Sequence, residues 1–264
     1  INQTTFARFL IFEYLQSYDK VVYLDCDLVC EEDIAALYNT DMNGFIIAAG
    51  RDTADAGWSN IVDNDTRAYI DQVIQLENRY DYFNAGVLVF NIPEFLSHIS
   101  VHELMELSAQ KTWKWLDQDI LNHVCRRRVN YLDQRWTVMA HKEAYFSRET
   151  TPEVWLPPEM KTAYDKTRQN PSIVHYVGHS TPCFHLHLYA DSAWRFWKYA
   201  ETTPYREILS AIAANSSADD SLNPLNRITG PLVSIIVPVY NSASCLSDLF
   251  ETLLRQTYRN LEIL

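Results

Sequence analysis

Glycine is scarce in this chain of 264 residues, which contains only 6 glycines. They are too far apart to form the glycine-rich loop that cradles phosphate groups in many nucleotide-binding proteins. That kind of phosphate site is therefore excluded, and a nucleotide bound by this chain needs another source of positive charge. A metal ion is the leading candidate for that charge.

Basic residues are few compared with acidic ones. The chain has 22 lysines and arginines against 34 aspartates and glutamates, which gives a net charge of −12. A protein with this balance repels phosphate backbones and anionic lipid headgroups. We therefore expect no nucleic-acid partner.

Cysteine is sparse, and the 5 cysteines form an odd, scattered set. This pattern argues against a disulfide framework and indicates a reducing compartment. Cys26 and Cys30 are not expected to form a zinc-binding pair, because their spacing is loose and no second Cys or His pair accompanies them.

Long hydrophobic runs are absent, since none reaches the roughly 18 residues of a membrane-spanning helix. The opening Ile1-Asn2-Gln3 also lacks the basic region and apolar stretch of a secretory signal. We expect a cytoplasmic protein, for which peripheral association with the inner face of the membrane is compatible with the sequence. Because no initiator Met is present, we expect a partial chain whose true N-terminus lies upstream.

Hydrophobic residues are plentiful: they make up 47% of the chain, including the aromatic residues at 13%, which is ample material for a large core. Short apolar runs predict strands at Val21–Leu24, Phe45–Ala49, Val87–Phe90 and Ile173–Val174. The β-branched and aromatic run Val21–Leu24 is typical of a strand buried on both faces in a parallel sheet.

Helices are predicted between these strands, at Val101–Lys114 and Gln118–Arg126. Thr4 or Thr5 is expected to cap an earlier helix, whose buried face would contain Phe6, Phe9, Leu10 and Tyr14. Alternating strands and helices predict an α/β fold.

The composition divides the chain into two units. Residues 1–214 form the first predicted domain, and the polar, turn-rich residues 215–231 form a predicted linker. In residues 232–264 we predict a strand at Leu232–Val239, a helix ending at Gln256 and a second strand at Leu261–Leu264. A lone strand–helix–strand is too small to be stable, so we expect this segment to be the truncated start of a second domain.

Asp25 and Asp27 directly follow a predicted strand, where open α/β sheets bind ligands. Two carboxylates at this spacing can hold a divalent cation. One alternative is that they merely end the strand in solvent. Another is the nucleophile motif of haloacid-dehalogenase-type phosphatases, which Asp25-Cys26-Asp27 also resembles.

His175 follows another predicted strand, and a lone His there can be an ordinary polar cap. Together with the two aspartates, its imidazole would complete a site suited to Mn²⁺. His179, His185 and His187 follow closely, so spacing alone does not single out the ligating histidine.

Two further segments have residue types suited to ligand binding. Asn84-Ala85-Gly86 comes just before a predicted strand, and its small residues let a ligand approach the backbone. The alternative is an ordinary turn. Asp117-Gln118-Asp119 lies at a predicted helix start, where the alternative is a helix cap.

These segments, taken in order, closely resemble the motifs of glycosyltransferase family 8. The motifs are Ala7-Arg8, Val22–Leu28, Tyr82–Val87, Asp117–Asn122 and His175–Gly178. Within the family, the resemblance is nearest to bacterial lipopolysaccharide α-galactosyl- and α-glucosyltransferases. It spans roughly residues 1–210. It implies a GT-A fold, a Rossmann-like mixed sheet flanked by helices, with a UDP-sugar donor and retention of anomeric configuration.

The resemblance also implies roles for individual residues. Asp25, Asp27 and His175 would bind the metal, which is Mn²⁺, with Mg²⁺ as the alternative. Gln118 would be catalytic, near the anomeric carbon, together with Asp117. The implied donor-binding residues are Arg8, Asp25, Asp27, Asp52, Asn84, Ala85, Asp117, Gln118 and Gly178.

The sequence departs from the family pattern at two places. The last motif commonly reads His-x-x-Gly-x-x-Lys-Pro-Trp, with the Lys on the diphosphate, whereas Thr181 takes the Lys position here. The family also begins with a strand and helix that hold uracil and ribose, and we expect these N-terminal elements to be missing before Ile1. Separately, Val233–Asn241 resembles the first strand of a glycosyltransferase family 2 domain.

The function implied by the resemblance is that of a retaining, metal-dependent hexosyltransferase. It would move galactose or glucose from UDP-galactose or UDP-glucose to a bacterial surface glycan, such as lipopolysaccharide, capsule or glycoprotein. Two alternatives stay open. One is a non-catalytic nucleotide-sugar-binding or scaffold protein, and the other is the phosphatase.

Overall fold

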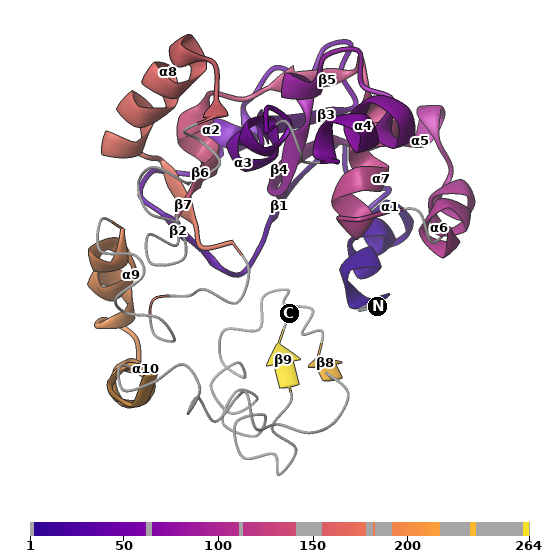
Figure 1. Cartoon of the computed structure of the whole chain (residues 1–264). Coiled ribbons are helices and arrows are strands. Elements are labelled where there is room, and N and C mark those ends of the chain that lie inside the picture. Colours follow the sequence, from indigo (N-terminus) through magenta and orange to yellow (C-terminus); the bar gives the residue numbers. More distant parts are fainter. Residues whose placement is uncertain are drawn as a thin grey trace.

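A four-stranded mixed sheet forms the centre of the fold (Figure 1). Its strands lie in the order β1 (Lys20–Leu24), β4 (Phe83–Asn91), β3 (Ile47–Arg51) and β5 (Val129–Tyr131). β4 is antiparallel to both β1 and β3, and β5 is parallel to β3. The computed structural model describes residues 3–61, 65–110, 113–140, 155–177, 182, 192–216, 233–235 and 261–263.

The burial predicted for Val21–Leu24 belongs instead to the central strand β4. Val87 and Val89 on β4 pack into the core on one face of the sheet, and Leu88 and Phe90 into the core on the other. β1 is a strand, as predicted, but it is antiparallel and only half-buried. Its side chains do contact both core clusters, which explains the apolar run. Among the described strands it pairs only with β4, so it forms an edge of the sheet.

A second, three-stranded sheet has the order β2 (Leu28–Cys30), β7 (Ile173–His175) and β6 (Val138–Met139). The chain passes from the first sheet to this one through residues 25–27, between β1 and β2 (Figure 1). Backbone hydrogen bonds hold this crossing at both ends: Asp25 N donates to Gly86 O at 2.8 Å, and Tyr176 N donates to Asp27 O at 2.8 Å.

The first helical segment is a 3-10 helix, Gln3–Leu10, followed by the short α1, Ile11–Tyr14. Phe6, Phe9 and Phe12 are buried at every third position, which matches the three residues per turn of a 3-10 helix. The predicted face is therefore confirmed for Phe6 and Phe9 and wrong for Leu10 and Tyr14, whose side chains are exposed.

Three helices pack against the larger core: α5 (Ile92–His98), α6 (Val101–Ala109) and α7 (Leu116–Cys125). α6 is shorter than the predicted Val101–Lys114, and its start is fixed by a capping box between Ser100 and Glu103. The core contains Phe12 stacked on Phe95, with ring centroids 3.8 Å apart. Ile120 and Leu121 of α7 are buried in the same core, which positions the first turn of α7 that leads into the site described below.

The remaining elements are shorter or lie further along the chain. The short helices are α2 (Ala35–Tyr38), α3 (Thr53–Trp58), α4 (Thr66–Tyr69), the π-helical turn Ile70–Ile74, and the 3-10 turns Arg79–Asp81 and Gln134–Thr137. The later helices are α8 (Pro158–Gln169), α9 (Ala193–Ala200) and α10 (Arg206–Ser216). Among the described residues, none of the helices combines the length and hydrophobicity that crossing a membrane requires.

The tail contains two short parallel strands, β8 (Val233–Ile235) and β9 (Leu261–Ile263). Both lie within the predicted strands of the second unit. The helix predicted between them is outside the described residues. α10 ends at Ser216, inside the predicted linker, and the domain boundaries stay predictions.

Candidate active site

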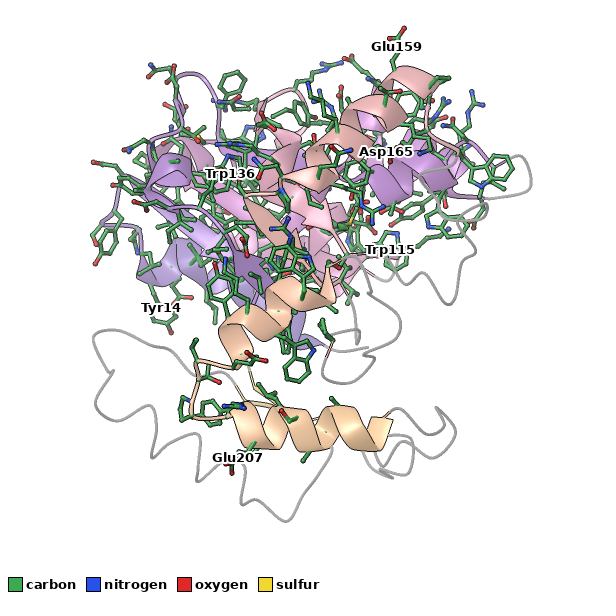
Figure 2. All side chains as sticks on the ribbon, turned by 90° about the vertical axis from the view of Figure 1, so that its left-hand side faces the viewer. Tyr14, Trp115, Trp136, Glu159, Asp165 and Glu207 are labelled. Carbon is green, nitrogen blue, oxygen red and sulfur yellow. The ribbon has the colours of Figure 1, made fainter. Side chains whose placement is uncertain are left out.

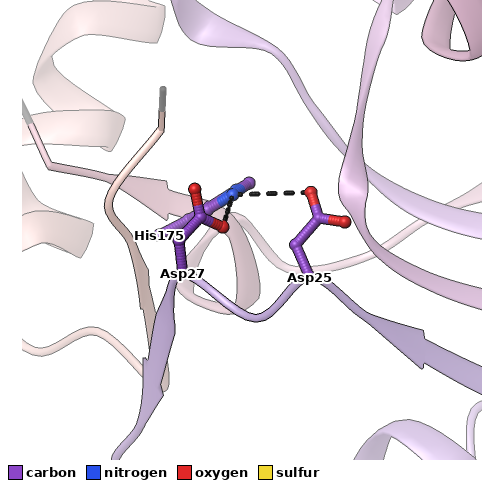
Figure 3. A group of neighbouring side chains, drawn as sticks. All are labelled: Asp25, Asp27 and His175. Carbon is purple, nitrogen blue, oxygen red and sulfur yellow. Dashed lines mark hydrogen bonds and ion pairs between the residues drawn. The ribbon is translucent and has the colours of Figure 1, made fainter. Parts of the chain in front are cut away.

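Asp25, Asp27 and His175 form a compact cluster where the two sheets meet (Figure 3). His175 Nε2 lies 2.9 Å from Asp27 Oδ1 and 3.6 Å from Asp25 Oδ2. The antiparallel pairing of β2 with β7 sets Leu28 opposite His175, which brings the end of β7 beside the crossing at residues 25–27. The structure thus brings together the three residues predicted to bind a metal.

The surroundings of His175 favour a charged or metal-bound imidazole. Burial by itself lowers the pKa of His175, but the hydrogen bond to Asp27 and the charges of Asp27, Asp25 and Asp52 outweigh it, so the pKa is raised. A divalent cation would take the place of the proton in this acidic environment.

Arg8 connects the Asp25–Asp27–His175 cluster with the start of α7. Its Nη1 donates to Ala85 O at 2.6 Å, and its Nη2 lies 3.3 Å from Asp25 Oδ1. Its Nε lies 2.7 Å from Asp117 Oδ2 as an ion pair that is not aligned as a hydrogen bond. Asp117 Oδ2 therefore has no hydrogen-bond donor among the described residues. Burial raises the pKa of Asp117, and the charge of Arg8 opposes this shift.

Asp52, Asn84 and Gln118 form a hydrogen-bonded group beside the cluster. Asp52 caps α3 through its Oδ1, and its Oδ2 accepts from Asn84 Nδ2 at 3.1 Å and from Gln118 Nε2 at 3.4 Å. Gln118 Oε1 accepts from the backbone N–H of Ala85 at 2.9 Å. Both the nitrogen and the oxygen of the Gln118 side-chain amide are therefore fixed by hydrogen bonds.

Asn84, Ala85 and Gly86 lie inside β4, so the prediction that they precede the strand is wrong. The pairing of β3 with β4 shifts register there: Ala49 lies opposite Leu88, but Arg51 lies opposite Phe83. Such an irregularity bends a strand and redirects its side chains. Asn122 braces the start of β4, because its side chain bonds Phe83 N and Phe83 O at 2.8 Å each.

Asp119 braces the start of α7 without being its cap, because the N-cap residue is Trp115 and no side chain caps it. Asp119 Oδ2 accepts from Trp115 N at 2.6 Å, and Asp119 also accepts from the hydroxyls of Tyr69 and Tyr82. Asp117 instead contacts Thr5 and Arg8. Sequence reasoning missed this bracing role of Asp119, which only the packing of Tyr69 and Tyr82 reveals.

One pocket of about 570 Å³ holds the candidate residues together. Its lining includes the predicted Arg8, Asp25, Asp27, Asp52, Asn84, Ala85, Asp117, Gln118 and His175. Gly178, Thr181 and the later histidines at 179, 185 and 187 lie outside the described residues. The pocket also contains residues that the sequence did not single out, among them Asp55, Trp58 and Trp115. The sequence contained one indication of their place in the site, which is that they lie close to Asp52 or Asp117 along the chain.

Solved structures with a similar fold include two glycosyltransferases. The bifunctional glycosyltransferase WbbM has a TM-score of 0.70 at 25% identity, over 80% of this chain and 37% of that one. The galactosyltransferase LgtC, solved with donor and acceptor sugar analogues, has a TM-score of 0.58 at 27% identity, over 78% of this chain and 71% of that one. The predicted α/β GT-A fold is confirmed.

Sequence comparison identifies the family to which the chain belongs. The lipopolysaccharide 1,3-galactosyltransferase of Salmonella typhimurium is 25% identical over 67% of this chain and 48% of its own length. This chain spans less than two thirds of the length of the curated relatives it matches. The family model for glycosyl transferase family 8 matches residues 1–183, and the likeness of the tail to family 2 stays a prediction. The chain therefore belongs to glycosyl transferase family 8.

Proposed function

We propose that this glycosyltransferase moves galactose or glucose from UDP-galactose or UDP-glucose to a bacterial surface glycan, with retention of configuration. The carrying observation is that Asp25, Asp27 and His175 line the same pocket as Arg8 and Gln118. This combination suits a diphosphate next to a sugar. The three-residue cluster can hold a metal ion, Arg8 supplies a positive charge, and Gln118 supplies a side-chain amide whose position is fixed. The lipopolysaccharide galactosyltransferase among the relatives supports the choice of acceptor.

The cluster fits a divalent cation. Its two carboxylate oxygens and one imidazole nitrogen lie within 4.8 Å of one another, and ligands about 2.0–2.6 Å from a shared ion lie up to about 5 Å apart. Mixed oxygen and nitrogen ligands suit Mn²⁺, whereas Mg²⁺ prefers oxygen alone. When bound, the ion supplies the positive charge that stabilises the departing diphosphate.

The protein's own residues would orient the donor sugar. Arg8 is held by Asp25 and Asp117, so its guanidinium is fixed at the wall of the pocket. Asp117 keeps an oxygen without a hydrogen-bond donor among the described residues, and that oxygen can accept from a sugar hydroxyl. Gln118 is fixed by Asp52 and Ala85, and this preorganisation suits a contact beside the anomeric carbon.

The other functions weighed from the sequence are less well supported. Membership of glycosyl transferase family 8 argues against the phosphatase. A scaffold protein that had lost turnover would be expected to lose its metal ligands, and this chain keeps both aspartates and the histidine.

The test is a transfer assay with UDP-hexoses and glycan acceptors in the presence of Mn²⁺. We expect UDP release with UDP-galactose or UDP-glucose, and an α-linked product by NMR, because these donors are α-anomers. A β-linked product would overturn retention. No release or transfer with any UDP-hexose would overturn the enzyme and favour the scaffold.

A further inference from the structure

Tyr23 is a half-buried side chain beside the Asp25–Asp27–His175 cluster, and the proposed function gives it no role. It lies on β1, packs against the larger core and comes two residues before Asp25. Alternate residues of an extended chain point to the same side, so the Tyr23 hydroxyl can reach the Asp25 carboxylate. The two groups do form a hydrogen bond, in which Tyr23 Oη lies 2.7 Å from Asp25 Oδ1.

The chemistry of the two partners sets the direction of this hydrogen bond. A tyrosine hydroxyl is protonated at neutral pH, and an ionised carboxylate can only accept, so Tyr23 donates to Asp25. The Tyr23 ring is held in place by the Arg8 guanidinium, whose Cζ lies 4.5 Å from the ring centroid. In contrast, Tyr14 at the end of α1 is exposed at the surface of the protein (Figure 2).

Arg8 contacts the same carboxylate oxygen of Asp25. Its Nη2 donates to Asp25 Oδ1 at 3.3 Å, so Oδ1 accepts hydrogen bonds from two side chains that also pack on each other. Arg8 is itself fixed by its contacts with Ala85 O and Asp117. Rotation of the Asp25 carboxylate would break both of the hydrogen bonds to Oδ1, and its orientation is therefore fixed.

The other oxygen of Asp25 faces the rest of the cluster. Asp25 Oδ2 lies 3.6 Å from His175 Nε2, and in Figure 3 it is the oxygen turned toward the imidazole. Among the described residues, no hydrogen bond engages Oδ2. The two oxygens thus have different surroundings: Oδ1 lies against hydrogen-bond donors, and Oδ2 lies where Asp25 could share a cation with Asp27 and His175.

We propose that Tyr23 is a positioning residue of the metal site, whose hydroxyl holds Asp25 so that this carboxylate offers a cation one oxygen, Oδ2. The inference rests on the metal-dependent transfer proposed above. It also has a consequence for the choice of metal. Ca²⁺ gathers about six to eight oxygen ligands and often takes both oxygens of a carboxylate. With Oδ1 engaged by Tyr23 and Arg8, Asp25 cannot supply its second oxygen, which disfavours Ca²⁺ relative to Mn²⁺.

Calorimetric titration of Tyr23→Phe with Mn²⁺ alone and with Ca²⁺ alone tests this role, because the variant keeps the ring and removes only the hydroxyl. We expect the Kd for Mn²⁺ to rise about tenfold, as for other losses of a group that orients a metal ligand. The Kd for Ca²⁺ should rise less than about threefold, since the freed Oδ1 can join a larger coordination shell. The preference for Mn²⁺ over Ca²⁺ therefore falls, which a general loosening of the fold would not cause.

Tyr131→Phe is the matched control. Tyr131 on β5 has similar surroundings but is not among the residues that line the active-site pocket. Arg51 Cζ lies 3.8 Å from its ring centroid, and its hydroxyl donates to Asp81 O at 2.7 Å. Removing this hydroxyl should leave both metal affinities unchanged, and melting curves without metal check that both variants are folded.

Three results would overturn the role of Tyr23. The first is an unchanged Mn²⁺ affinity in Tyr23→Phe, and the second is an equal loss of Mn²⁺ affinity in Tyr23→Phe and Tyr131→Phe. The third needs no variant: it is a wild type that binds Ca²⁺ as tightly as Mn²⁺.

These titrations need no turnover, which separates the inference from the proposed function. A weaker Mn²⁺ site in Tyr23→Phe, together with no UDP release by the wild type, would contradict the proposed function alone. UDP release by the wild type, together with equal Mn²⁺ affinities in the wild type and Tyr23→Phe, would overturn the role of Tyr23 alone. No Mn²⁺ binding to the wild type would overturn that role whether or not UDP is released.

Discussion

Gly86 lies directly against His175: a Cβ at position 86 would stand 2.2 Å from His175 Cε1 and 2.6 Å from its Nδ1. Such distances are far inside van der Waals contact, so any larger residue must displace the imidazole. A glycine on β4 thereby determines where the third member of the Asp25–Asp27–His175 cluster can lie.

Replacing Gly86 should weaken metal binding. In Gly86→Ala the methyl group displaces His175, and we expect Mn²⁺ affinity to fall about 10- to 100-fold, as for other changes that disturb the support of a metal ligand. Calorimetric titration with Mn²⁺ checks this. Gly44→Ala is the control, because no atom lies within 4 Å of a Cβ there. Gly44→Ala should lower the stability of the fold, because position 44 has a positive φ, without changing Mn²⁺ affinity. Equal Mn²⁺ affinities for the wild type, Gly86→Ala and Gly44→Ala would contradict the account.

Gln118→Ala should lower kcat far more than it weakens UDP binding. The reason is that the proposed contact of Gln118 is with the reacting sugar and not with the nucleotide. Steady-state kinetics and UDP calorimetry give the two quantities. If UDP affinity falls in step with turnover, Gln118 has a structural role through its bonds to Ala85 and Asp52, and the proposed role is wrong.

Asp55→Asn should stabilise the fold at neutral pH. Burial and the charges of Asp52 and Asp119 raise the pKa of Asp55 in the folded state, so the folded state binds the proton of this carboxyl more tightly than the unfolded chain does. Stability from Asp55 is therefore full below the unfolded pKa and is lost as pH rises through the folded pKa. We expect Tm of Asp55→Asn to exceed that of the wild type by roughly 2–4 °C at pH 7.5 and by less at pH 4. A Tm difference that does not depend on pH would contradict the assignment.

Thr181 tests the departure from the family motif. A lysine at this position would add a charge-assisted contact to the diphosphate. In the enzyme account the wild type already turns over, so Thr181→Lys should tighten UDP binding with only a modest gain in activity. Clear activity in Thr181→Lys with no detectable transfer or donor hydrolysis in the wild type would favour the scaffold.

The sequence predicted the parts of the site that follow from local pattern. An apolar run ending in Asp25-Cys26-Asp27 predicts a strand followed by two carboxylates, and both are found there. Whether that strand pairs in a parallel or an antiparallel way depends on contacts between segments that are distant in the sequence. For that reason β1 was expected in a parallel sheet, although it pairs antiparallel with β4.

The part of the pocket lined by α3 and the start of α7 could not be predicted for the same reason. Asp55 and Trp115 are far apart in the sequence, and only the packing of α3 near the start of α7 brings both to one pocket. The strand irregularity opposite Gly50 likewise depends on the register of β3 and β4. No apolar periodicity encodes it, so Asn84 and Gly86 were predicted to lie outside the strand.

The most direct test of the central claim is UDP release from UDP-galactose and UDP-glucose with Mn²⁺, after EDTA, and after Mn²⁺ is restored. We expect EDTA, Asp25→Ala and Asp27→Ala each to lower the rate on the order of 10²–10³-fold, because the charge that stabilises the leaving diphosphate is lost. Restored Mn²⁺ should recover the wild-type rate but not the rates of the variants. Undiminished UDP release in EDTA would contradict the metal-dependent account.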